Sequence, residues 1–222
     1  MDAHIVWLSD DGAVPTTDLL SVLEPADRQE SIRYRDPARL RSFALSRRLL
    51  RQTLGNLLQT NKTGIRLARA DSGRLQLASP DHLHISLSHA AGLVAVIVAP
   101  APCGVDIERL RTVNADRIAR RYFTTTEYDW LQQHPATRET DFFRFWTLKE
   151  ACVKALGVGL AHHLATLAFD IANDTPQQLD DGERGERMAL WQQAGPDLVL
   201  AAAVKTTEPV NWQATHLTID GL

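Results

Sequence analysis

The sequence predicts an α+β fold built from two similar α/β halves. A strand, a helical region and several further strands follow one another twice along the 222 residues, and this succession is typical of α+β proteins. A stretch with two prolines, residues 99–103, lies between the two series and predicts a linker. The halves are therefore expected to comprise residues 1–102 and 103–222, although no repeat is visible at the level of single residues.

The first half is expected to begin with a strand over residues 5–8 and to contain one long helix. Asp36 and Pro37 predict its start, because aspartate caps the free N–H groups of a first turn and proline suits the first helical position. Periodic leucine and phenylalanine residues extend the helix to about residue 58. Short strands separated by turn residues follow, at residues 65–68, 74–77, 84–87 and 93–98.

The second half is expected to repeat this order, beginning with a strand over residues 105–108. Helical patterns follow it, over residues 116–122, 127–133 and 141–156. Strand patterns occupy the rest of the chain, over residues 167–171, 188–191, 198–204 and 212–217.

The composition is that of an ordinary globular protein. Hydrophobic residues make up 44% and charged residues 23%, which excludes disorder throughout. The net charge of −3 gives no general attraction to nucleic acid or to anionic membranes. We see no signal peptide and no apolar stretch long enough to span a bilayer. Cys103 and Cys152 form no metal-binding or disulfide pattern, so a cytoplasmic protein is expected.

Two carboxylates share one face of the predicted strand at residues 104–108. Asp106 and Glu108 are two positions apart, so their Cα atoms lie about 6.5–7 Å apart and both side chains project to the same side. Such a pair repels itself unless a positive charge lies nearby, and oxygen ligands of this kind suit Mg²⁺. The alternative is a solvated strand face that carries two unrelated acids.

A second group of charges lies on the amphipathic helix predicted over residues 141–156. Glu150 and Lys154 are neighbours on one helix face, and a simple surface ion pair would explain them. Trp146 lies one turn before this pair and Gly157 one turn after it, which favours a site over an isolated pair. In the segment 86–89, the adjacent Ser88 and His89 point to opposite sides of a strand and so cannot act as a nucleophile pair.

These motifs resemble those of the surfactin-type 4′-phosphopantetheinyl transferases. The chain contains GVDIE at residues 104–108, a Ser-His strand end before it, and WTLKEACVKALGVGL at residues 146–160 after it, in the order and approximate spacing of that family. RYFTTTEYDWL, between the two motifs, is also similar. The resemblance covers roughly residues 30–165.

The resemblance implies an enzyme that moves the phosphopantetheine group of coenzyme A to a serine of an acyl or peptidyl carrier protein. It implies a monomeric pseudo-dimer with the active site between its halves, and Mg²⁺, or alternatively Mn²⁺, as the metal. Glu150 is the implied base, and Lys154 would neutralise or protonate the leaving bisphosphate. The implied metal ligands are Asp106, Glu108 and Glu150. The implied coenzyme A site includes His89, Lys149 and Lys154, and Trp146 lines it more as a packing anchor.

Other assignments stay open at this point. Glu127 matches a glutamate of the family, but Thr124 and Glu127 also form a capping box. Arg74 stands where the family has a lysine followed by proline. Several arginines compete for the 3′-phosphate of coenzyme A, and we expect Arg47 and Arg74. An acidic carrier helix is expected to dock near residues 117–121, which contain three arginines.

Two alternative functions remain. The same acids and lysine suit a magnesium-dependent nuclease, although the net negative charge argues against nucleic acid as a partner. A module that binds coenzyme A without catalysing transfer is the other alternative, although the acidic residues and the lysine are all intact. The identity of the carrier protein cannot be read from the sequence.

Overall fold

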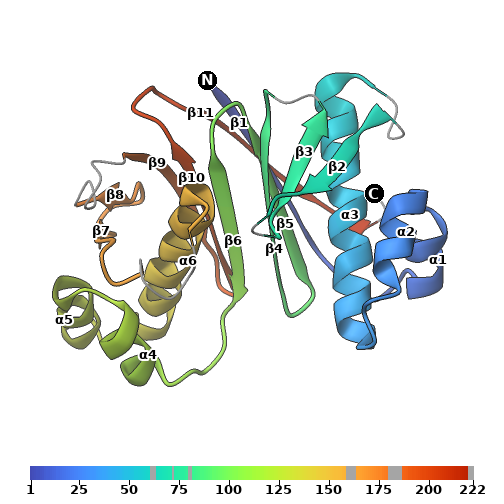
Figure 1. The fold of residues 1–222 in the computed structure, drawn as a ribbon. Coiled ribbons are helices and arrows are strands. Elements are labelled where there is room, and N and C mark those ends of the chain that lie inside the picture. Colours follow the sequence, from blue (N-terminus) through green and yellow to red (C-terminus); the bar gives the residue numbers. More distant parts are fainter. Residues whose placement is uncertain (61–63, 72, 80–81, 159–163, 180–186, 220–222) are drawn as a thin grey trace.

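The computed structural model describes residues 1–222 except 61–63, 72, 80–81, 159–163, 180–186 and 220–222. Two long helices lie on the outer sides of the molecule, and the strands of two sheets lie between them (Figure 1). The fold is thus mixed α/β, as predicted.

The first sheet has the strand order β11-β1-β5-β4. The long helix α3 (Pro37–Leu58) covers one face of this sheet, and two short helices precede it. Asp36 accepts a hydrogen bond from the Arg39 backbone N–H, which confirms the predicted cap. The other elements of this part are β1 (Asp2–Ser9), α1 (Thr16–Ser21), α2 (Pro25–Ser31), β2 (Arg66–Arg69), β3 (Leu75–Ser79), β4 (His84–Ala90) and β5 (Leu93–Ala99).

The second sheet has the order β6-β10-β9, and the helix α6 (Arg138–Leu156) packs against it. Without β11, the first sheet has the order β1-β5-β4, which is equivalent to β6-β10-β9 in the second sheet. In both sheets the strand that comes last in the sequence lies in the middle. The elements are β6 (Cys103–Arg109), α4 (Ala115–Tyr122), α5 (Thr125–Gln133), β7 (Phe169–Asp170), β8 (Gln177–Gln178), β9 (Met188–Ala194), β10 (Leu198–Lys205) and β11 (Asn211–Leu217).

The inner faces of the two sheets share one core. Alternate residues of β5 and β6 point into it, while the residues between them point outward. On β6, Val105 and Ile107 lie in this inner core, so Asp106 and Glu108 face the side on which α6 packs. The alternation predicted from the sequence is confirmed.

The last strand does not stay in the second sheet. β11 pairs with β1 in parallel and forms the edge of the first sheet, a long-range pairing that no local pattern indicates. The helices α1 and α2 were also not predicted. The strand expected over residues 167–171 is reduced to the two residues of β7. Among the described residues, no helix is both long and apolar enough to cross a membrane.

Candidate functional site

The close approach of β6 and α6 builds the site. A Cβ atom at Gly104 would lie 1.9 Å from the carbonyl oxygen of Ala151 and 2.7 Å from the backbone nitrogen of Ala155. Only glycine fits there, and its absence of a side chain lets the helix backbone lie directly on the strand. Because Glu150 and Lys154 are four residues apart on α6, both lie alongside the acidic face of β6.

Asp106 joins three elements. Its Oδ1 atom accepts a hydrogen bond from Lys154 Nζ of α6 and one from Ser88 Oγ of β4, both at 2.8 Å. Lys154 also donates to the carbonyl oxygen of Val105 at 2.9 Å. The other oxygen, Asp106 Oδ2, is buried and has no hydrogen-bond partner among the described residues. A buried carboxylate oxygen without a partner is costly, and a bound cation would satisfy it.

The two glutamates of the site are unusually basic. Burial, together with the negative charges of Asp106 and Glu108, raises the pKa of Glu150 to about 7. Burial also raises the pKa of Glu108, although the Arg111 guanidinium opposes this shift. Arg111 Nη1 donates to Glu108 Oε2 at 2.7 Å. Three carboxyl groups whose charges disfavour one another are thus gathered beside two cations.

A cleft of about 470 Å³ opens beside Glu150 and Lys154. It lies between the two parts of the chain, because its walls come from β4 and the Arg74 region on one side and from α6 on the other. Such a volume suits a small-molecule ligand. Its lining includes Arg74, Leu75, Ile85, Ser86, Leu87, Glu150, Val153, Lys154, Gly157 and Val158.

Arg74, which the sequence analysis expects to contact a phosphate of coenzyme A, lines this cleft. Its Nη2 atom donates to the carbonyl oxygen of Cys103 at 2.8 Å, across the junction of the two parts. A Cβ atom at Gly157 would lie 3.4 Å from Arg74 Nη1. Gly157 also has a φ of 69° and ends α6 in the left-handed conformation. The glycine therefore both ends the helix and leaves room for the guanidinium.

His89 is exposed on β4, next to Ser88. Partial burial of the ring and the positive charge of Lys154 lower its pKa, so the imidazole is neutral at pH 7. The structure therefore brings together Asp106, Glu108, Glu150, Lys154, Arg74 and His89. Ser88 and Arg111 belong to the same group and were missed. Ser88 lies two residues from Ser86, on the same face of β4, which is the signal that the sequence offered.

Lys149 contradicts the prediction that it contacts coenzyme A. Its side chain is 0% exposed, and its Nζ atom forms an ion pair with Glu127 at 2.8 Å. It also donates to the carbonyl oxygens of Leu164 and Leu167. Successive helix residues point about 100° apart, so Lys149 lies on the apolar side while Glu150 faces the cleft. Lys149 follows the buried Phe145 by four residues, and this spacing could have indicated that both side chains lie on the apolar side of the helix.

Glu127 is explained by structure. The Thr124 capping box is present with both of its hydrogen bonds, and the same carboxylate pairs with Lys149 and accepts from the Phe169 backbone N–H at 3.2 Å. Trp146 does not line the cleft either. Its ring packs against Tyr122 and Phe142, as a packing residue of the helix.

Arg47 is also placed away from the cleft, which contradicts the prediction of a phosphate contact. It is 3% exposed and forms ion pairs with Asp27 at 3.1 Å and Glu30 at 3.0 Å. Its guanidinium stacks over the Phe43 ring. The partners lie 17 and 20 residues away in sequence, so helix periodicity gave no sign of this burial.

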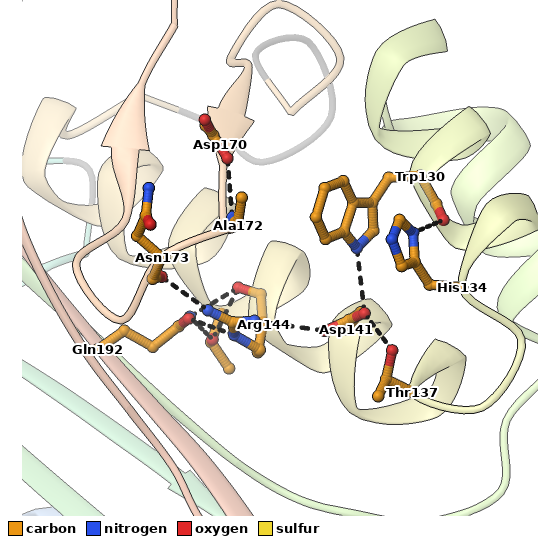
Figure 2. A network of polar contacts seen from close by, with 10 residues as sticks. Trp130, His134, Thr137, Asp141, Arg144, Asp170, Ala172, Asn173 and Gln192 are labelled. Atoms are coloured by element: carbon orange, nitrogen blue, oxygen red, sulfur yellow. Dashed lines mark hydrogen bonds and ion pairs between the residues drawn. The ribbon is translucent and has the colours of Figure 1, made fainter.

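A separate polar network holds the other end of α6 (Figure 2). Asp141 accepts hydrogen bonds from Trp130 Nε1 at 3.1 Å and from Thr137 Oγ1 at 2.7 Å. Arg144 contacts Asp141 and donates to Gln192 Oε1 at 3.1 Å. These contacts tie α6 to α5 and β9, so the helix is fixed at one end by this network and at the other by the site.

The residues present fit a magnesium ion that keeps part of its shell for water and phosphate. No group of three His, Cys, Asp or Glu side chains in the described ranges is arranged as a ready metal cage. Mg²⁺ typically takes only one or two carboxylates and completes its shell with water and substrate phosphates. The buried, unpartnered Asp106 Oδ2 supplies one such ligand.

Comparison with known proteins adds independent information. Residues 102–203 match the model of the 4′-phosphopantetheinyl transferase superfamily. The chain is 26% identical to the 4′-phosphopantetheinyl transferase Sfp of Bacillus subtilis over 70% of its own length and 69% of that protein's. It is 31% identical to the 4′-phosphopantetheinyl transferase HetI of Nostoc over 65% of its own length and 63% of the relative's.

Another relative is human L-aminoadipate-semialdehyde dehydrogenase-phosphopantetheinyl transferase, at 30% identity over 62% of this chain and 48% of that protein. The chain thus spans between half and seven-tenths of the length of these three relatives. The comparisons confirm the resemblance predicted from the motifs and the prediction of a transferase, and the family match extends over residues 102–203.

Proposed function

We propose that this chain transfers the 4′-phosphopantetheine group of coenzyme A to a serine of an apo acyl or peptidyl carrier protein. In this reaction the serine Oγ forms a bond to the phosphorus that bears the pantetheine arm. The bond between this phosphorus and the bridging oxygen of the pyrophosphate breaks, and adenosine 3′,5′-bisphosphate leaves. The observation that carries the proposal is the buried, unpartnered Asp106 Oδ2 beside Lys154 and Glu150, at a cleft between the two parts of the chain.

Asp106, Glu108 and Glu150 are the residues that would hold Mg²⁺, or Mn²⁺ in its place. When bound, the metal supplies positive charge for the pyrophosphate oxygens. This assignment is supported by the raised pKa values of Glu108 and Glu150, because a nearby cation favours the ionised form of both carboxyl groups.

Glu150 is the proposed base. In the metal-free protein the pKa of Glu150 is raised to about 7, so burial and the neighbouring acids make this carboxylate more basic than an ordinary glutamate. Its oxygen would take the proton of the serine hydroxyl as the new bond forms. Its position on the wall of the cleft supports this role.

Lys154 and Arg74 are the proposed contacts for the phosphates. Lys154 would face the negative charge that grows on the departing bisphosphate, and such preorganised charge lowers the barrier most where charge develops. Arg74 brings a second positive charge to the same cleft from the first part of the chain. His89, neutral and exposed, would donate a hydrogen bond to a phosphate oxygen.

The two parts of the chain are proposed to form a pseudo-dimer, divided into residues 1–102 and 103–222. The equivalent strand orders β1-β5-β4 and β6-β10-β9 support this division. A monomer with its active site at the junction follows from it, because one chain then supplies both walls. We propose a cytoplasmic location, where carrier proteins and coenzyme A are available.

The carrier is proposed to approach α4. Arg117 and Arg121 are exposed there, whereas Arg120 already pairs with Asp116 at 2.8 Å. Exposed arginines suit an acidic helix of a carrier protein. Of the three arginines in residues 117–121, Arg117 and Arg121 are therefore the better candidates.

Mass spectrometry of several apo carrier proteins tests the reaction. Each is incubated with the protein, coenzyme A and Mg²⁺, and the expected result is a mass gain equal to one phosphopantetheine. A matched reaction with Glu139→Gln, which changes a carboxylate near the start of α6, should give the same gain, whereas Glu150→Gln should not. Binding of coenzyme A without any gain on any carrier would instead indicate a non-catalytic module, and cleavage of plasmid DNA with Mg²⁺ would indicate a nuclease.

A further inference from the structure

Both carboxylates of β6 already have a cationic partner from this chain. Lys154 Nζ lies 2.8 Å from Asp106 Oδ1, and Arg111 Nη1 lies 2.7 Å from Glu108 Oε2. The repulsion expected between two acids on one strand face is thus relieved without a metal ion. Any divalent cation that binds Glu108 must therefore compete with a guanidinium for the same carboxylate.

The two cations are held differently. The Lys154 side chain is 28% exposed and is fixed also by the Val105 carbonyl oxygen, within the wall of the cleft. The Arg111 side chain is 51% exposed, so its ion pair is open to water and correspondingly weak. Arg111 is therefore the partner that a metal ion can displace more easily.

Displacement would not release Arg111 from the site. Its guanidinium also donates to the Arg109 carbonyl oxygen at 3.0 Å and stacks over the Phe143 ring with 5.2 Å to the centroid. These two contacts do not involve Glu108. A guanidinium held in this way stays beside the carboxylate and keeps opposing a second positive charge there.

We propose that Arg111 is a positioning residue that acts through Glu108 and sets the affinity of the site for divalent cations. Without a phosphate ligand, Arg111 neutralises Glu108 and keeps metal binding weak. A pyrophosphate in the cleft adds negative charge, which offsets the positive charge of Arg111 and favours the metal ion at Glu108. Metal and pyrophosphate therefore bind together more readily than metal alone. This inference rests on the proposed function, because it uses the metal assigned to Glu108.

Metal binding by the free protein tests the proposal directly. Mn²⁺ is titrated into the protein without coenzyme A, and the bound ion is followed by electron paramagnetic resonance. Arg111→Gln removes the competitor and one positive charge near the metal, so Mn²⁺ should bind roughly three- to tenfold more tightly. Arg111→Lys keeps a positive charge, on a compact ammonium, so its Mn²⁺ affinity should be nearly as weak as that of the wild type.

Arg109→Gln is the matched control. Arg109 is a neighbouring arginine whose side chain donates to the Ala91 carbonyl oxygen rather than to Glu108. The substitution Arg109→Gln therefore removes the same positive charge without freeing a carboxylate. Its Mn²⁺ affinity should change less than twofold. Equal changes in Arg109→Gln and Arg111→Gln, or no change in either, would overturn the role of Arg111.

Adding coenzyme A gives a second readout. The gain in Mn²⁺ affinity of Arg111→Gln should shrink when coenzyme A is present, because the pyrophosphate then compensates the guanidinium. A gain of the same size with and without coenzyme A contradicts the coupling.

Carrier modification by the wild type, measured in parallel, separates the two proposals. An active transferase whose variants all bind Mn²⁺ equally overturns only the role of Arg111. The expected Mn²⁺ pattern without modification of any carrier overturns only the reaction. Absence of Mn²⁺ binding in every protein, together with no modification of any carrier, overturns both.

Discussion

Two groups of buried charges, one in each part of the chain, differ in a single respect. In the first part, Asp27 is paired with both Arg47 and Arg51, and Glu30 is paired with Arg47 and Arg69. Each carboxylate oxygen there has a cationic partner. In the second part, one oxygen of Asp106 is paired and the other, equally buried, has no partner. Among the described residues, only a donor of the first group, Arg47 Nε, lacks a hydrogen bond, whereas in the second group a carboxylate oxygen is left without a partner. A cation would satisfy the second group and would find no free carboxylate oxygen in the first.

From this difference we infer that the first group stabilises the fold and that the second binds a ligand. The first group contains more arginines and adjoins a larger hollow, about 1090 Å³ against 470 Å³. On charge and size alone it would be the better phosphate site. Its charges are nevertheless satisfied internally, so it gains little from an anion. We therefore expect changes in the first group to affect folding and changes in the second to affect activity.

The largest expected effect is on the stability of the first group. Asp27→Asn leaves Arg47 and Arg51 without their shared carboxylate, and removal of one partner from a buried pair typically costs about 3–5 kcal/mol. For a chain of this size, that corresponds to a drop in melting temperature of roughly 10 °C. Thermal unfolding followed by circular dichroism measures it. Asp116→Asn, which breaks an exposed pair, serves as the control and should leave the melting temperature nearly unchanged.

The second prediction is that a change at Asp106 affects activity more than stability. Asp106→Asn should lower carrier modification on the order of 10²-fold or more, because the site loses the charge that holds the metal. Its melting temperature without metal should fall less than that of Asp27→Asn, because Lys154 is partly exposed to water and keeps its hydrogen bond to the Val105 carbonyl oxygen. A variant with near-normal kcat would show that Asp106 holds no metal. Loss of stability as large as that of Asp27→Asn would erase the distinction between the two groups.

The site was largely predictable from the sequence because its residues follow local periodicity. Asp106 and Glu108 are two apart on a strand, and Glu150 and Lys154 are four apart on a helix, so each pair shares a face by geometry alone. Gly104 then brings the two elements into contact. Arg47 and Lys149 were placed wrongly because their fate depends on Asp27 and Glu127, which approach only in the folded chain.

The fold was predictable to a similar extent. The long helix α3 begins at the Asp36 cap and α6 ends at Gly157, and both have long apolar patterns. The strands β5 and β10 are strongly apolar. The short helices α1 and α2 carry too few turns for a periodic signal. The return of β11 to β1 depends on the packing of the two sheets, which residues 211–217 do not reveal by themselves.

A smaller effect is expected on the pH dependence of stability. In the metal-free protein the pKa of Glu150 lies near 7, raised from 4.5, so the folded state holds a proton that the unfolded state has already released. The folded state therefore loses stability as the pH rises from about 4.5 to 7. Glu150→Gln removes this loss, and it should be more stable than the wild type above pH 7 by about 1–2 kcal/mol after allowance for solvent screening.

Urea unfolding of both proteins at pH 4, 6 and 8 without divalent metal measures this difference. The two curves should nearly coincide at pH 4, where Glu150 is protonated in both states, and should separate as the pH rises. Glu139→Gln is the control, because Glu139 is outside the cleft and its variant should follow the wild type at each pH. If the advantage of Glu150→Gln were independent of pH, the negative charge of Glu150 would not be the cause.

The smallest expected effect concerns α4, where paired and unpaired arginines can be compared within two turns of helix. Arg120 donates to Asp116 and stacks over the Tyr128 ring, whereas the exposed Arg117 and Arg121 form no ion pair among the described residues. Charges at the rim of an interface mainly set the association rate and its dependence on salt. Arg117→Glu with Arg121→Glu should therefore raise the KM for the carrier several-fold and leave the KM for coenzyme A unchanged. It should also weaken the dependence of the carrier KM on NaCl, because the attraction that salt screens has been removed.

Arg120→Gln is the matched comparison. The charge of Arg120 is already neutralised by Asp116, so the salt dependence of this variant should remain close to that of the wild type. Initial rates measured at low and moderate NaCl decide the matter, and identical salt slopes for the wild type and the double variant would mean that the carrier does not dock on this helix.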